Sequence, residues 1–326
     1  MGSKEVKIVD ANIGIQEQFH LPVMPKEVVK YLDLPHNAVV VDATVGLGGH
    51  SEHILHEYPS ILKLIGMDVD QAAISLAEGR LCRNGEKVEM VNRNFIHIKN
   101  TVNSMGISCV DGIVADLGIS SFQLERSGKG FSFTRNEPLD MRMEAGLQFS
   151  AYDLVNGMKR DELEYILKNY GEEKFSYKIS DSIVKIRAKK CIQTSVELAS
   201  IISSSIPRKF HPKKIHPATK TFQALRISVN NELDNLETFI TQAVEILKQG
   251  ARLVIISFHS LEDRIVKKMF RKLESSCVCP PDLAVCACSK TQQITMVTKS
   301  VLRPEKEEVE ENPRARSSKM RVAEGA

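Results

Sequence analysis

The sequence predicts an α/β protein in which a mainly parallel sheet, covered by helices on both faces, is interrupted by an all-helical segment. Two observations support this prediction. Apolar, β-branched runs alternate with helical segments over the first 120 residues. The alternation stops after Gly118 and resumes near Leu233, and the residues between have helical periodicity. With 326 residues, the chain is long enough for such an arrangement.

The expected strands are near-continuous apolar runs, which is typical of parallel strands buried on both faces. In the first part of the chain they are residues 38–41, 62–67, 88–91 and 112–115. Helices are expected between them at 51–58 and 71–83. A helix at 233–247, which Gly250 ends, precedes a fifth strand at 252–258.

The middle of the chain has a different character. Residues 120–148 are rich in Gly, Ser, Phe and charge and predict a long ordered loop. Helices are predicted at 161–169 and 174–190, and the capping box from Thr194 to Glu197 opens another helix that ends near residue 204. We expect loops at 207–217 and 305–311, the first basic and the second acidic. The predicted division is therefore residues 1–130, a helical insertion at 131–226, and residues 227–326.

The net charge of +3 is unevenly distributed. From Lys159 to Arg226 there are 15 Lys and Arg against 7 Asp and Glu, a local charge of +8. Such an excess suits a polyanionic partner such as nucleic acid. A solvated helical surface explains the charge equally well.

The sequence gives no sign of export or of a membrane span. No apolar run reaches the roughly 18 residues that cross a bilayer, and the N-terminus lacks the apolar core of a signal peptide. We therefore expect a cytoplasmic protein that does not bind a membrane. Four of the seven cysteines lie within 12 residues, at Cys277, Cys279, Cys286 and Cys288. Four thiolates suit zinc, but the C-x-C spacing is shorter than that of most zinc sites, so we assign no metal.

A nucleotide-like cofactor is indicated where the first strand ends at Asp42 and a glycine turn follows from Gly46. Ser51 occupies the place of the third glycine in the dinucleotide fingerprint, which disfavours a nicotinamide cofactor. A carboxylate at Asp42 suits the ammonium group of a methionine-derived cofactor. Asp68 ends the second strand, 22 residues after Gly46, where a carboxylate can accept hydrogen bonds from both ribose hydroxyls.

Two further strand ends carry candidate residues. Phe95 follows the third strand, where its ring can cover an adenine, and Asp116 ends the fourth. The four strand ends, with their candidate residues in this order along the chain, favour S-adenosylmethionine as the cofactor. No cysteine stands near Asp116 or near His259, which follows the fifth strand, so a nitrogen or oxygen acceptor is favoured over a pyrimidine carbon.

Asp116 and His259 are the candidate catalytic residues. The Asp116 carboxylate can hold the hydrogens of an exocyclic amine, or it can contact only the cofactor. His259 can accept a proton, bind the target, or be a structural histidine bonded to the backbone. Residues 208–220 and 314–321 are candidate phosphate contacts, and Phe131, Phe133 and Phe222 are either base-stacking or core residues.

Longer motifs resemble the bacterial methyltransferases that modify N4 of a cytidine in the decoding region of 16S ribosomal RNA. The resemblance begins at His20 and covers nearly the whole chain. The motifs are HLPVM at 20–24, GGHS at 48–51, DLGISS at 116–121, GFSF at 130–133, LDMRM at 139–143, HPATKTFQALRI at 216–227, SFHSLEDRIVK at 257–267 and NPRARS at 312–317. The two longest runs are highly specific.

This resemblance implies a Rossmann-like class I methyltransferase sheet with an inserted all-helical module that binds RNA. It implies S-adenosylmethionine as cofactor and 16S rRNA, in the small ribosomal subunit, as substrate. The cofactor contacts that it implies are Gly48, Gly49, His50, Asp68, Phe95, Asp116 and Gln123. The chain departs from the family pattern at Asn136-Glu137-Pro138, where Asp-Gly-Pro is usual, and at Glu125, where Asp is usual. The family lacks the Asp-Pro-Pro-aromatic motif of many amino methyltransferases, so those enzymes do not define the role of Asp116.

Two other functions remain alternatives from the sequence. A non-catalytic RNA-binding ribosome assembly factor would keep the methyltransferase fold, and a methyl-transfer assay separates it from an enzyme. A nicotinamide-dependent oxidoreductase would bind NADH and would not be stabilised by S-adenosylhomocysteine. The sequence leaves open the oligomeric state, a homodimer included, and the identity of any general base.

Overall fold

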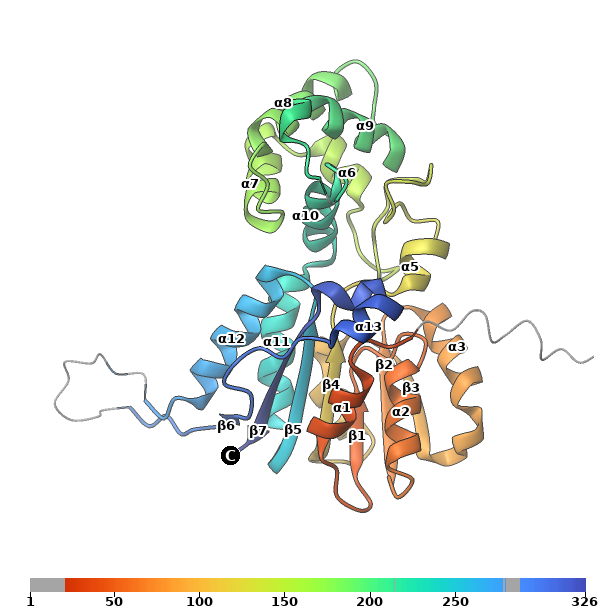
Figure 1. Ribbon diagram of the computed structural model, residues 1–326, viewed down its shortest axis with the longest axis vertical. Helices are drawn as coiled ribbons and strands as arrows, with labels where there is room; N and C mark the ends of the chain where they lie inside the picture. The colour runs from red at the N-terminus through yellow and green to blue at the C-terminus, as the bar shows by residue number, and fades with distance from the viewer. Residues whose placement is uncertain (1–20, 214, 278, 280–287) are drawn as a thin grey trace, which may run out of the picture.

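The computed structural model describes residues 21–213, 215–277, 279 and 288–326 (Figure 1). His20, where the family motifs begin, and Cys286 lie outside the described residues. Seven strands form one sheet in the order β3-β2-β1-β4-β5-β7-β6. They are β1 (Val39–Asp42), β2 (Lys63–Asp68), β3 (Val88–Asn92), β4 (Val110–Asp116), β5 (Leu247–Ser257), β6 (Ile294–Met296) and β7 (Lys319–Gly325).

The first five strands are parallel, and β7 is antiparallel to both of its neighbours, β5 and β6. Successive residues of the central strands belong to opposite cores. Val39 and Val41 pack on one face of β1, whereas Val40 packs on the other. A strand whose residues are all buried must be covered on both sides, so the predicted α/β fold is confirmed.

The helices α1 to α4 are interleaved with the first strands, and α11 to α13 with the last. They are α1 (Pro25–Leu32), α2 (Gly49–Glu57), α3 (Gln71–Leu81), α4 (Ile98–Ser104), α11 (Glu232–Glu245), α12 (Ser260–Glu274) and α13 (Lys306–Glu311). One core joins the sheet to α4, α11 and α12, and the core on the opposite face joins it to α1 and α2. No helix in the described part of the chain has both the length and the apolar character needed to span a bilayer.

The remaining helices lie between β4 and β5 in the sequence. They are α5 (Ser121–Arg126), α6 (Ala151–Gly157), α7 (Arg160–Tyr170), α8 (Ser176–Arg187), α9 (Ser195–Ser205) and α10 (Thr219–Asn230). Helices α6 to α10 form a helical module at one end of the molecule (Figure 1). This module has a hydrophobic core of its own, with fully buried residues such as Leu163, Ile183 and Leu198. Each such side chain contributes about 1.5–3 kcal/mol through burial.

The division of the chain at residues 130 and 226 stays a prediction, and α10 runs across residue 226 to Asn230. Two expected loops are wrong in part. Helix α5 lies inside the loop expected at 120–148, and residues 306–311 form α13. A tertiary contact ties α13 to the first helix, because Glu308 accepts a hydrogen bond from the Met24 amide at 2.6 Å. Gly250 lies within β5 rather than at a helix end.

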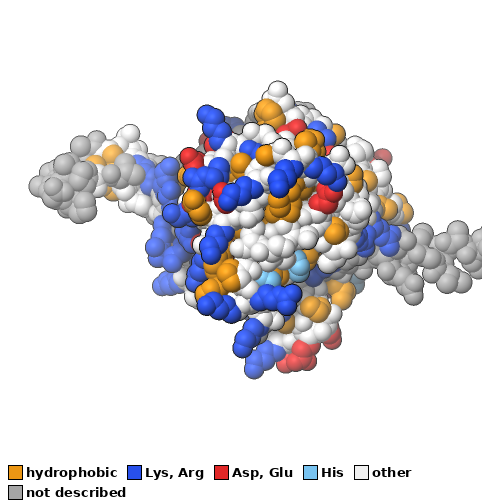
Figure 2. Space-filling view, turned by 90° about the horizontal axis from the view of Figure 1, so that it is seen from above, with side chains coloured by type: hydrophobic (Ala, Val, Ile, Leu, Met, Phe, Trp, Pro, Cys, Tyr) orange, Lys and Arg blue, Asp and Glu red, His pale blue; other side chains and the backbone are white. Residues whose placement is uncertain are grey.

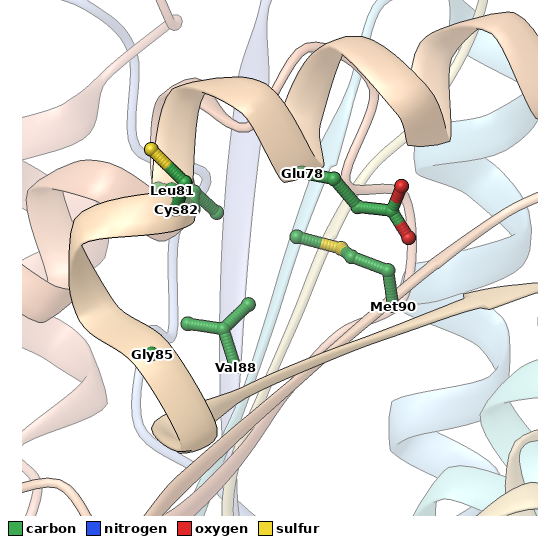
Figure 3. A pocket seen from close by; sticks show the side chains of 6 residues that line it. All are labelled: Glu78, Leu81, Cys82, Gly85, Val88 and Met90. Atoms are coloured by element: carbon green, nitrogen blue, oxygen red, sulfur yellow. The ribbon is translucent and has the colours of Figure 1, made fainter.

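A small cavity of about 130 Å³ lies beside the end of α3 (Figure 3). Leu81, Val88 and Met90 form most of its apolar lining, and Glu78 supplies a carboxylate. Cavities that hold a nucleotide-sized ligand measure roughly 300–1,000 Å³. This cavity is therefore too small for the expected cofactor.

Candidate active site

A second cavity, of about 770 Å³, lies at the carboxyl ends of the parallel strands. In an open α/β sheet this edge is where ligands bind. Residues from the ends of β1, β2 and β4 line one side, and residues of α10 and the starts of α11 and α12 line the other. The predicted site residues on its wall are Gly49, His50, Asp68, Phe95, Asp116, Gln123 and His259. Gly48 is not on this wall.

The glycine turn between β1 and α2 explains the position of Gly48. Gly46 and Gly48 have φ values of +50° and +80°, which residues other than glycine rarely adopt. A Cβ on Gly48 would lie 3.4 Å from Ala77 Cβ and from Leu81 Cδ1. Gly48 therefore shapes the turn and lets α3 pack closely against it, while Gly46 and Gly49 line the cavity.

Asp42 does not line the cavity. Its side chain is buried, and Ser51 Oγ donates a hydrogen bond to Asp42 Oδ2 at 2.6 Å. Burial raises the pKa of Asp42 above its ordinary value. The interpretation that Asp42 faces the ammonium group of a cofactor is therefore wrong. Ser51, in the place of the third glycine, instead anchors the start of α2 to the end of β1.

Asp68 lies at the end of β2 and faces both the glycine turn and the cavity. Its Oδ2 accepts a hydrogen bond from the Gly46 amide at 2.9 Å, and its Oδ1 accepts one from the Asp70 amide at 2.9 Å. Each carboxylate oxygen keeps a second lone pair, so Asp68 can still accept two hydroxyl donors. Burial raises the pKa of Asp68 to about 6.

Phe95 and Gln123 reach the same cavity from the segments that follow β3 and β4. The Phe95 ring packs edge-to-face on Phe239 of α11, with ring centroids 5.0 Å apart. This contact fixes the orientation of the Phe95 ring. Gln123 forms a capping box with Ser120 at the start of α5, and its Nε2 donates to Asp70 Oδ2 at 3.3 Å. The structure thus brings Asp68, Phe95 and Gln123 together at one cavity wall.

His50 and Asp116 form a pair beside them. His50 Nε2 lies 3.4 Å from Asp116 Oδ2. Burial lowers the pKa of His50, but the interaction with Asp116 outweighs burial, so the pKa lies above its ordinary value. Asp116 Oδ1 is buried and has no hydrogen-bond partner among the described residues. Asp116 itself lines the cavity, so a ligand bound there can contact this residue.

His259 lies at the start of α12, across the cavity. Its Nδ1 accepts a hydrogen bond from the Glu262 amide at 3.4 Å, and its Nε2 lies 3.1 Å from Glu262 Oε1. The neutral ring therefore carries its proton on Nε2. Burial raises the pKa of Glu262, but its interactions with His259, Arg226 and the Phe258 amide together outweigh burial, so this pKa lies below its ordinary value. His259 thus has the backbone contact of a structural histidine and also lines the cavity.

An ion pair that the sequence did not predict lies beside His259. Arg226, near the end of α10, binds Glu232, at the start of α11, through two hydrogen bonds of 2.8 Å each. Both residues line the cavity and are largely buried. The ligand atoms of Glu232, His259 and Glu262 lie within 4.8 Å of one another. The guanidinium of Arg226 supplies positive charge to this acidic cluster, and its place within the HPATKTFQALRI run was the only signal of its importance.

Together, the strand order, the glycine turn, and an acidic residue at the end of β2 define a class I methyltransferase. The chain belongs to the MraW methylase family, whose pattern matches residues 17–326. It is 44% identical over 308 residues to the ribosomal RNA small subunit methyltransferase H of Clostridioides difficile (strain 630), covering 94% of this chain and 99% of that protein. It is 47% identical over 303 residues to the protein of the same name from Clostridium botulinum (strain Loch Maree / Type A3), covering 93% and 97%.

Proposed function

We propose that this chain transfers a methyl group from S-adenosylmethionine to the N4 amine of a cytidine in the decoding region of 16S rRNA, within the small ribosomal subunit. The observation that carries the proposal is the position of Asp116. Asp116 lines the cavity between the glycine turn and the helical module, and its buried Oδ1 has no hydrogen-bond partner among the described residues. The names of the relatives, ribosomal RNA small subunit methyltransferase H, support the choice of substrate.

The residues on the sheet side of the cavity fit the cofactor. A Cβ on Gly46 would meet nothing closer than the Thr44 carbonyl oxygen, at 3.9 Å, so space for a ligand remains beside this glycine. Asp68 would accept hydrogen bonds from the ribose, and Phe95 and Gln123 would contact the adenine side. When bound, the cofactor supplies an activated methyl group on its sulfonium.

Asp116 is assigned to the target amine. The lone pair of an exocyclic amine is delocalised into the ring, so an acceptor that holds one amine hydrogen makes the lone pair more available. Asp116 Oδ1 can accept that hydrogen, while His50 holds Oδ2 and the Asp116 amide donates to Thr44 Oγ1 at 2.7 Å. The bound cofactor would supply the methyl group to the nitrogen, and Asp116 would take the proton that the nitrogen loses.

His259 is assigned a positioning role. Its Nδ1 already accepts from the backbone, and its Nε2 carries a proton that faces Glu262. Neither nitrogen of the neutral ring is therefore a free base in this arrangement. We assign proton acceptance to Asp116 alone, and we expect His259 with Glu262 to hold the far wall of the cavity in place.

The helical module is the proposed RNA-binding surface. Lysine and arginine side chains gather on its outer face (Figure 2). The exposed basic residues of the module are Lys159, Lys168, Lys174, Lys178, Lys185, Lys189, Lys190, Arg208, Lys209 and Lys213. Positive charge of this density attracts the phosphate backbone and makes binding dependent on salt.

Among the three candidate stacking residues, Phe133 suits a base best. Phe131 and Phe222 are buried, with 5% and 4% of their surface exposed. Phe133 is only partly buried, lines the cavity, and stacks on the His216 ring at 4.6 Å between centroids. An aromatic stack that borders the cavity gives an unstacked base a surface to rest on.

The test is methyl transfer to small subunits from a strain that lacks the gene. We expect the purified chain to add one methyl group, and mass spectrometry of RNA fragments to locate it on N4 of a single cytidine. Isolated 16S rRNA serves as the second substrate and shows whether the assembled subunit is required. Binding to subunits without transfer, or a methyl group at another atom, would contradict the proposal.

A further inference from the structure

Three cysteines form a cluster away from the cavity. Cys277 and Cys279 follow the end of α12, and Cys288 precedes β6. Their three sulfur atoms lie within 4.8 Å of one another, and none of the three residues lines the cavity. The methyl-transfer chemistry therefore does not account for this cluster.

The separation of two of these sulfur atoms matches a tetrahedral metal site. Cys277 Sγ and Cys288 Sγ lie 3.7 Å apart. Zinc–thiolate bonds of about 2.3 Å in a tetrahedral arrangement put neighbouring sulfur atoms about 3.8 Å apart. The sulfur atoms of a disulfide would be about 2.05 Å apart.

The backbone near Cys277 suits a thiolate rather than a thiol. The Cys279 amide donates a hydrogen bond to Cys277 Sγ at 3.3 Å. A hydrogen bond to sulfur stabilises its negative form, which is the form that binds metal. The same turn brings two cysteines that are only two residues apart to one side, so the short C-x-C spacing does not prevent both from serving as ligands.

Further hydrogen bonds order the chain on both sides of the cysteines. Ser275 Oγ donates to the Cys277 carbonyl oxygen, and the Ser275 hydroxyl accepts from the Cys277 amide at 3.2 Å. After Cys288, Lys290 Nζ donates to the Lys272 carbonyl oxygen in the last turn of α12. These contacts pre-organise the cysteines, which reduces the entropy lost when a metal binds.

We propose that Cys277, Cys279 and Cys288 bind a zinc ion through three thiolates. The ion links the residues after α12 to those before β6 as a structural site and takes no part in methyl transfer. Soft thiolate ligands select zinc over magnesium or calcium. We assign no fourth ligand, and Cys286 lies outside the described residues.

The test measures zinc in the full-length chain, purified under reducing conditions without chelator. We expect elemental mass spectrometry to find one zinc ion per chain. The zinc should be released when a mercurial reagent titrates the thiols. The double variant Cys277→Ser/Cys288→Ser should contain at least tenfold less zinc than the unaltered chain. The matched control is Cys191→Ser, because Cys191 is exposed and lies outside the cluster.

Cobalt substitution in the unaltered chain provides a measurement that does not depend on the variant folding. We expect thiolate-to-cobalt charge-transfer bands and the intense visible bands of a tetrahedral site. The proposal is overturned if the native chain holds only traces of zinc and gives no such bands with cobalt. Full zinc content in the folded double variant, or a Cys277–Cys288 disulfide in protein kept under reducing conditions, would also overturn it.

Discussion

His50 Nε2 and Asp116 Oδ2 lie 3.4 Å apart, joining the first turn of α2 to the end of β4. Asp116 ends β4, and His50 lies in the helix that follows β1, the strand paired with β4, so this pairing brings the two residues to the same edge of the sheet. The pair leaves the second oxygen of Asp116 without a hydrogen-bond partner among the described residues. His50 therefore orients the carboxylate of Asp116, a residue that lines the cavity.

Replacing this carboxylate should slow methyl transfer while leaving the cofactor bound. For Asp116→Asn, we expect the single-turnover rate to fall by about 10²–10⁴, because an amide cannot accept the proton from the amine. The dissociation constant for S-adenosylhomocysteine should change by less than about tenfold. Rapid-quench transfer assays and calorimetry measure the two quantities. If only cofactor affinity fell, Asp116 would be a cofactor contact alone.

The sequence located the residues at the strand ends because their order follows from local signals. Asp68 and Asp116 each end an apolar run, and parallel strands bring such ends to one edge of the sheet. The Arg226–Glu232 pair lacks such a signal. Its partners belong to two helices joined at Asn231, whose φ of 51° reverses the chain. A separation of six residues matches no spacing within a single helix.

The strands β6 and β7 were missed for a related reason. The β7 strand carries the charged residues Lys319, Arg321 and Glu324, so its own pattern does not identify it. It forms because it pairs with β5, some 70 residues earlier in the chain, from Arg252 with Glu324 to Ser257 with Lys319. Arg321 is buried only because Asp263 of α12 accepts its hydrogen bond at 2.7 Å. Such long-range partners are not visible in local sequence.

Cofactor affinity should depend on pH through Asp68. Its pKa is raised by burial to about 6, and the ionised form is the better acceptor for ribose hydroxyls. The dissociation constant for S-adenosylhomocysteine should therefore rise as pH falls through about 6, approaching tenfold per pH unit below that value. The raised pKa also makes the stability of the fold depend on pH. The protonated form of Asp68 stabilises the folded state fully below about pH 3.8, and this stabilisation is lost as pH rises through about 6.

The control for this pH effect is Asp68→Asn. We expect the variant to bind S-adenosylhomocysteine weakly, by a factor of about 10–100, and with no inflection near pH 6. Calorimetry across this range, in buffers of matched ionic strength, measures both proteins. An unchanged inflection in Asp68→Asn would assign the pH effect to another group.

Breaking the pair between α10 and α11 should destabilise the fold. Arg226→Gln leaves the largely buried Glu232 carboxylate without its partner, which costs about 3–5 kcal/mol. Adding Glu232→Gln should recover part of this loss, because the unpaired charge is then absent. Urea denaturation of the two single variants and the double variant gives the coupling energy.

The exposed pair Lys99–Glu245 is the matched control, and Lys99→Gln should cost less than about 1 kcal/mol. Equal losses at the two sites would contradict the assignment of a buried, cooperative pair.

Two glycine-to-alanine variants, one inside the glycine turn and one outside it, can separate the effect of backbone strain from the effect on cofactor binding. Gly48 and Gly106 have φ values of +80° and +74°, so an alanine at either position costs about 1–2 kcal/mol of strain. A Cβ on Gly106 would meet nothing within 4 Å, whereas one on Gly48 would lie 3.4 Å from Ala77 and Leu81 of α3. The Cβ of Gly48→Ala would contact α3 at ordinary van der Waals distance, so its cost comes from the positive φ; relief of that strain would move the turn whose neighbouring glycines, Gly46 and Gly49, line the cavity. We expect similar losses of stability in urea for Gly48→Ala and Gly106→Ala, but a loss of S-adenosylhomocysteine affinity of at least tenfold only for Gly48→Ala. Equal affinities in the two variants would mean that the shape of this turn does not control the cofactor site.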